Sequence, residues 1–130
     1  MDPIYTYMGK SLMLNKNHNN AAIQVHILPD NEMREIGFTD YNPTTWYFCK
    51  YGMGGQDDIS FSLSVKKNDE TDWRIDILDE NFLQPYDYQA MLERNTKNPI
   101  PHKVKEDVEY WMQHLTDKGV VSGHNYGEYI

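Results

Sequence analysis

Apolar and polar residues alternate along the segment from Ile59 to Leu78. Both halves of the segment, ISFSLSVKK and WRIDIL, carry an apolar side chain at every second position. A period of two places alternate side chains on one face of a sheet. The stretch NDETD between them is rich in residues that hydrogen-bond the local backbone and favour a turn. The pattern predicts a β-hairpin whose buried face is formed by Ile59, Phe61, Leu63, Val65, Trp73, Ile75 and Ile77.

Four other segments have the patterns of strands, namely residues 4–14, 22–28, 35–38 and 46–51. The first is one strand or two short ones interrupted at Gly9, and the second is ended by Pro29. WYFCKY at residues 46–51 is aromatic on both faces, which predicts an interior strand. Because the connections from this strand through the hairpin are short, an antiparallel meander is favoured.

Two helices are predicted after the sheet. The longer covers Lys103 to Lys118, ends at Gly119, and has one apolar stripe made of Val104, Val108, Trp111, Met112 and Leu115. The shorter lies in PYDYQAMLERN, with Pro85 in its first turn. TKNPIP separates the two helices as a linker, because its prolines disfavour helix continuation. We expect the longer helix to cover the buried face of the sheet and the tail from Val120 to dock as an edge strand.

These elements predict an α+β fold in which both helices cover one face of an antiparallel meander sheet of four to six strands. We expect residues 1–130 to form a single globular domain. A chain of 130 residues with 39% hydrophobic and 13% aromatic residues can bury a core of its own.

The net charge of −8 is concentrated in one region of the chain. Between Asp57 and Glu93 there are ten acidic and three basic residues, a balance of −7, whereas the flanking regions are nearly neutral. Phosphate contact requires a basic surface, so direct binding of nucleic acid or of an anionic membrane is not expected.

The remaining composition indicates a soluble protein of the cytoplasm. Cys49 is the only cysteine, so a disulfide within the chain is excluded. No apolar run reaches the length of a membrane helix, and the first ten residues lack the pattern of a signal peptide.

Known catalytic motifs are absent. None of the five histidines lies three or four residues from another, and no G-x-S-x-G motif occurs. The glycines of GMGGQDD do not have the spacing of a phosphate-binding loop, and two aspartates follow them. Cys49 is expected to be buried and inert in an aromatic strand. We therefore expect no enzyme activity, no cofactor and no metal site.

The acidic residues are the strongest candidate for a site. In a meander, Asp57, Asp58, Asp79 and Glu80 lie at one end of the sheet, while Asp69, Glu70 and Asp72 lie at the other. Three interpretations are open: a solvated rim, a cation site, and a face that binds a basic protein by charge complementarity. The candidate partner-binding residues are Asp57, Asp58, Asp69, Glu70, Asp72, Asp76, Asp79, Glu80, Tyr86 and Asp87.

Tyrosine supports the partner-binding interpretation. Seven of the ten tyrosines cannot all lie in the core of so small a domain, and exposed tyrosine is typical of interfaces. These seven are Tyr47, Tyr51, Tyr86, Tyr88, Tyr110, Tyr126 and Tyr129. The alternative is that these rings pack at the edge of the core with their hydroxyls in water.

The favoured function is therefore that of a small acidic interaction protein, in its most specific form an inhibitor that engages a basic nucleic-acid-binding surface by imitating phosphate charge. In size and regional acidity the chain resembles phage-encoded inhibitors of bacterial defence, including anti-CRISPR proteins; this resemblance is one of composition and implies no site residues. One alternative is a small-ligand-binding domain or hydrolase with a pocket lined by Trp46, Tyr51, Trp73 and His26. Another is a structural or assembly subunit that binds copies of itself.

Overall fold

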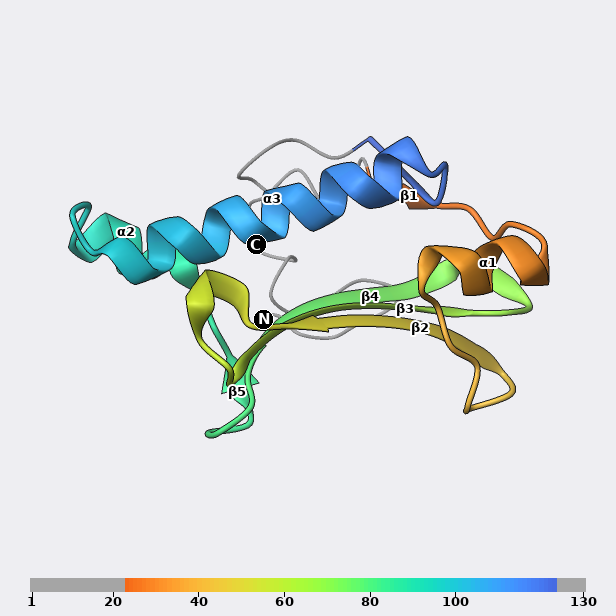
Figure 1. The fold of residues 1–130 in the computed structure, drawn as a ribbon, viewed down its shortest axis with the longest axis horizontal. Helices are drawn as coiled ribbons and strands as arrows, with labels where there is room; N and C mark the ends of the chain where they lie inside the picture. The colour runs from red at the N-terminus through yellow and green to blue at the C-terminus, as the bar shows by residue number, and fades with distance from the viewer. Residues whose placement is uncertain (1–22, 124–130) are drawn as a thin grey trace.

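The computed structural model describes residues 23–123, which form an α+β fold (Figure 1). In chain order the elements are β1 (Gln24–Val25), α1 (Asp30–Ile36), β2 (Thr45–Tyr51), the 3-10 turn η3 (Met53–Gly55), β3 (Ile59–Lys66), β4 (Asp69–Asp79), β5 (Gln84–Pro85), α2 (Tyr88–Arg94), α3 (Pro99–Asp117) and β6 (Val121–Ser122). Strands β2 to β5 form an antiparallel sheet in that order, and β1 pairs with β6 separately. The predicted fold class is confirmed.

The central hairpin has the buried face that its alternation predicts. Apolar residues stand directly opposite one another, including Phe61 with Ile77 and Leu63 with Ile75. Such cross-strand pairs are the unit that stabilises a sheet. All seven of the predicted residues are buried. The turn is shorter than predicted, because β4 already begins at Asp69 and a register shift follows Val65.

Helix α3 packs across the sheet, on the same side as the other helices (Figure 1). Four residues of its predicted stripe are fully buried, and the fifth, Trp111, lies at the flank with its ring 5.8 Å from that of Phe48. The helix begins at Pro99, so the linker predicted to extend through Pro101 is wrong at its end. Prolines fit the first turn because its N–H groups have no intrahelical partner. Asn98 caps this turn by accepting a hydrogen bond from the Ile100 N–H at 3.3 Å.

The shorter helix also begins at a different residue from the one predicted. Pro85 belongs to β5, where it stands opposite Leu78, and α2 starts at Tyr88. Asp87 caps it by accepting a hydrogen bond from the Ala90 N–H at 3.0 Å. An aspartate at this position satisfies one of the free N–H groups of the first turn, which the proline cannot do.

The strand predicted at residues 35–38 is wrong, since helix α1 occupies this part of the chain. The helix ends at Gly37, whose φ of 124° lies in a region that favours glycine. The Phe38 N–H then donates to the Met33 carbonyl at 3.0 Å, which is a Schellman ending. Met33 and Phe38 are both buried, so the apolar residues serve a helix end rather than an alternating strand.

The prediction that residues 46–51 form an interior strand is also wrong, because β2 lies at the edge of the sheet. Trp46 and Phe48 enter the core, whereas Tyr47 and Tyr51 on the other face are 44% and 64% exposed. Aromatic residues occupy both faces because a tyrosine can keep its hydroxyl in water. Cys49 shares this outer face and is partly exposed rather than buried.

The predicted strand at residues 4–14 lies outside the described residues, as does the tail beyond Gly123. Of the strand predicted at 22–28, only β1 forms, and it pairs with β6, so the start of the tail does dock as a strand. Val120 and Val121 are buried there. Within residues 23–123, no helix combines the length and the apolar character needed to cross a membrane.

Candidate functional site

Four acidic residues lie at the end of the sheet where β3 begins and β4 ends. Ile59 pairs with Asp79, and the Glu80 N–H donates to the Asp58 carbonyl at 2.7 Å. The sheet thus brings Asp57, Asp58, Asp79 and Glu80 together, as the meander predicts. We call these four residues the acidic end.

The turn from Glu80 to Leu83, which joins β4 to β5, is held in place by the acidic end. The Asp79 carboxylate accepts hydrogen bonds from the Asn81 N–H at 3.1 Å and the Phe82 N–H at 3.4 Å. The Asn81 side chain donates to the Asp58 carboxylate at 2.8 Å. The Glu80 carboxylate accepts from the Ser60 hydroxyl at 2.7 Å. These contacts fix the turn against the neighbouring loop.

Two large apolar side chains lie exposed in this turn. Phe82 and Leu83, which we call the apolar tip, are 71% and 78% exposed. Leu83 has a φ of 53°, in the left-handed region, which costs a leucine about 1–2 kcal/mol. The turn projects from the sheet on the side away from α3 (Figure 1). Adjacent exposed apolar residues on a strained turn are typical of an interaction site.

Two tyrosines border the acidic end, one on the surface and one inside. Tyr51 is exposed, and its neighbour Cys49 and then Glu80 raise the pKa of its hydroxyl. Tyr86 is buried at 8% exposure, and burial, followed by the charges of Asp79 and Asp58, raises its pKa. Tyr86 was a candidate contact residue, but it supports this end of the sheet from within and offers little surface to a partner.

The other predicted acidic residues are separated from this end. Asp69 starts β4, so it lies roughly 30 Å from Asp79 at 3.3 Å per residue. Hydrogen bonds from Thr71 hold the pKa of Asp69 below its ordinary value. Glu70 accepts a hydrogen bond from the Ile27 N–H at 2.6 Å and so attaches the segment after β1 to β4.

The remaining acidic candidates, Asp72, Asp76 and Asp87, lie in three different local environments. Asp76 forms an ion pair with Arg74 at 3.2 Å, and Asp87 is the cap of α2. Asp72 is exposed beside Asp69 and Glu70. The ten candidate residues therefore do not form one continuous surface. The acidic end is the part of the set that the fold gathers around an exposed feature.

The residues of the alternative aromatic pocket are also dispersed. Trp46 is buried, with Arg34 and Lys67 over its ring at 5.3 and 4.4 Å from its centroid. Tyr51 lies on the opposite face of β2. His26 and Trp73 do line a cavity of about 300 Å³ together with Glu70. Among residues 23–123, no three His, Cys, Asp or Glu residues are grouped so that they could hold a metal ion.

Comparison with known proteins establishes similarity of fold only. No protein-family model matches the chain, and no curated protein matches it. Among solved structures, it is similar to a DUF1831 family protein from Lactobacillus plantarum, with a TM-score of 0.56 and 12% sequence identity. The similarity covers 76% of this chain and 82% of that one. At this identity the comparison assigns an architecture and carries no residue roles.

Proposed function

We propose that this chain is a small interaction protein of the cytoplasm whose acidic end and apolar tip bind a basic surface on a partner protein. The observation that carries the proposal is the exposure of Phe82 and Leu83 beside four carboxylates. Protein interfaces have an apolar centre that supplies most of the affinity and a polar rim. Charge at the rim speeds association with an oppositely charged partner.

In its most specific form, the partner surface is a nucleic-acid-binding site, which the protein inhibits by placing carboxylates where phosphates would lie. Sites that bind nucleic acid are basic, because most of their affinity comes from phosphate contacts. The regional balance of −7 between Asp57 and Glu93 suits such a surface. This role requires no catalytic group, and it would suit a phage-encoded inhibitor of the anti-CRISPR type.

A partner is first captured from a bacterial lysate on the immobilised chain, identified by mass spectrometry and purified. The test then compares the direct binding of this partner to the chain and to two variants. The first replaces Asp57, Asp58 and Asp79 with Asn and Glu80 with Gln, which removes charge but keeps oxygen acceptors for the turn. The second is Phe82→Ala with Leu83→Ala. Tyr41→Ala is the matched control, because Tyr41 is 93% exposed in a different turn. We expect both variants to lose binding by about tenfold or more, and the control to bind like the parent.

Salt and nucleic acid then separate the general proposal from its specific form. Binding that weakens with salt and is displaced by duplex DNA or RNA supports occupation of a nucleic-acid site. Salt-sensitive binding without displacement supports another basic surface. Equal binding by the parent and both variants would contradict the proposal.

A further inference from the structure

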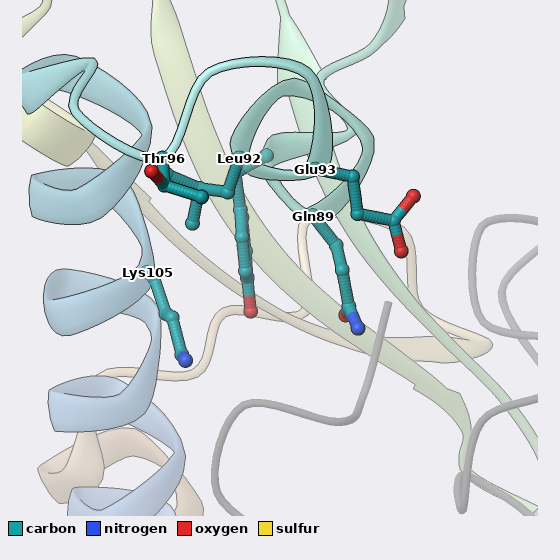
Figure 2. Close-up of a pocket in the computed structure, with 6 residues that line it drawn as sticks. Gln89, Leu92, Glu93, Thr96 and Lys105 are labelled. Carbon is teal, nitrogen blue, oxygen red and sulfur yellow. The ribbon is translucent and has the colours of Figure 1, made fainter.

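A second site lies between α2 and α3, away from the acidic end. A cavity of about 250 Å³ opens there, lined by Tyr88, Gln89, Leu92, Glu93, Thr96 and Lys105 (Figure 2). Sites for drug-sized ligands have volumes of about 300–1,000 Å³, so this cavity suits a smaller molecule.

Two buried polar atoms of this cavity lack a partner. The Tyr88 hydroxyl and the Gln89 side-chain oxygen make no hydrogen bond, although Tyr88 is fully buried. A buried polar atom without a partner destabilises the folded state, and most such atoms in proteins are hydrogen-bonded. A ligand that bonds both atoms would recover this energy.

The walls of the cavity carry opposite charges. Lys105 extends from α3 on one side, and Gln89 and Glu93 come from α2 on the other (Figure 2). Gln89 and Glu93 are four residues apart, so they lie on the same face of the helix. Burial raises the pKa of Glu109, one turn further along α3, and the Lys105 ammonium opposes this rise, so Lys105 also lies near that carboxyl group. Leu92 supplies an apolar surface in the same cavity.

We propose that this cavity binds a free α-amino acid. The Lys105 ammonium and the Tyr88 hydroxyl would donate to the ligand's carboxylate. The Gln89 oxygen and the Glu93 carboxylate would accept from its ammonium group, with the ligand side chain against Leu92. This arrangement gives both orphaned atoms a partner, sets the ligand's ammonium group against Glu93, and lets its carboxylate share Lys105 with Glu109. Burial raises the pKa of Tyr88, so its hydroxyl is a donor at neutral pH.

The test titrates the whole chain with each of the twenty common L-amino acids, using calorimetry and NMR shifts of Gln89 and Lys105. The amino acid that binds most tightly is then compared with its amide, which lacks the carboxylate, and with its N-acetyl form, which lacks the ammonium. Two variants, Tyr88→Phe and Lys105→Met, remove one contact each. Lys66→Met is the control, because Lys66 is exposed on β3.

We expect at least one amino acid to bind saturably and both capped analogues to bind about tenfold or more weakly. Tyr88→Phe and Lys105→Met should weaken binding similarly, and Lys66→Met should not. Tyr88→Phe retains the buried ring and should fold, with a melting temperature at or above that of the parent when no ligand is present. The proposal is overturned if none of the twenty binds, if the capped analogues bind equally well, or if the two cavity variants bind like the parent. None of these residues belongs to the acidic end, so the result is independent of partner binding.

Discussion

Phe61 and Phe82 show how differently one side chain acts in two environments. Phe61 is fully buried on β3, whereas Phe82 is 71% exposed in the apolar tip. Phe61→Ala should lower the free energy of unfolding by about 3–5 kcal/mol, because it leaves a cavity in the core. Phe82→Ala should change it by less than about 0.5 kcal/mol. Urea denaturation of both variants measures these changes in the free energy of unfolding. Equal unfolding midpoints for the two variants would mean that Phe82 lies in the core or that Phe61 lies outside it.

Asp40 should make the stability of the fold depend on pH in the acid range. Its carboxylate accepts from Lys67 at 2.9 Å and from Arg34 at 3.0 Å, and these bonds, that from Lys67 foremost, hold its pKa below 3.8. A carboxyl group whose pKa is lower in the folded state stabilises the fold at any pH above its pKa in the unfolded state. This contribution is lost as the pH falls through its pKa in the folded state. Asp40→Asn should therefore melt below the parent at neutral pH, and the gap should narrow as the pH falls below the ordinary pKa of an aspartate. A gap of equal size at neutral and at acid pH would contradict this origin.

At the scale of single residues, alternation identified the buried face of the hairpin but not the exposed apolar residues. Phe82 and Leu83 look like core residues in the sequence, because hydrophobicity alone does not say which side of a turn faces water. Their position just after the acidic pair Asp79 and Glu80, outside the strand alternation, was the available signal. The opposite holds for Tyr86, which was expected at the partner-binding surface but is buried, because tyrosine occurs both in interfaces and in cores.

At the scale of elements, η3 and α3 approach so closely that one glycine is required. The Gly54 N–H donates to the Asp107 carboxylate at 2.8 Å, and a Cβ at Gly54 would lie 2.5 Å from Val104 Cγ2. Gly55 also has a positive φ but has no atom within 4 Å of such a Cβ. Both Ala variants incur the left-handed cost of about 1–2 kcal/mol, and overpacking adds about 1–3 kcal/mol at Gly54 alone. Calorimetry should show a lower melting temperature for Gly54→Ala than for Gly55→Ala. Equal melting temperatures would mean that α3 shifts at little cost to make room for the added methyl group.

The elements predicted correctly are those with long, consistent patterns. The hairpin and α3 each repeat one period over many residues, so the pattern outweighs local exceptions. Helix α1 has seven residues, and its only fully buried residue is Met33, which is too little for a helical stripe to be recognised. The edge position of β2 depends on which strand pairs beside it, and this is a tertiary property that its own residues do not encode.

At the scale of the whole molecule, topology decided which candidate sites could be anticipated. The acidic end follows from a meander, because hairpin connections return the chain to the same end of the sheet. The cavity between α2 and α3 depends on the angle set by the short connection from Asn95 to Asn98, for which the sequence offers no rule. Tyr88 and Lys105 are far apart in the chain and carry no shared motif.

The two parts of the proposed interface should act on different rate constants. The carboxylates of the acidic end act over a distance and should raise the association rate, whereas the apolar tip acts only after contact and should slow dissociation. Against a purified partner, the charge-removing variant should associate about tenfold more slowly at low salt and resemble the parent at high salt. Phe82→Ala with Leu83→Ala should associate normally but dissociate about tenfold faster or more at any salt.

Surface plasmon resonance at two ionic strengths measures both constants, with Tyr41→Ala as the control. If the tip variant instead altered association alone, the apolar tip would not be buried in the complex. If salt left the parent's association rate unchanged, the carboxylates would not steer the encounter, because exposed charges separated by more than a Debye length are screened in salt. A separation of the two effects would assign the acidic end to recognition at a distance and the apolar tip to the lifetime of the complex.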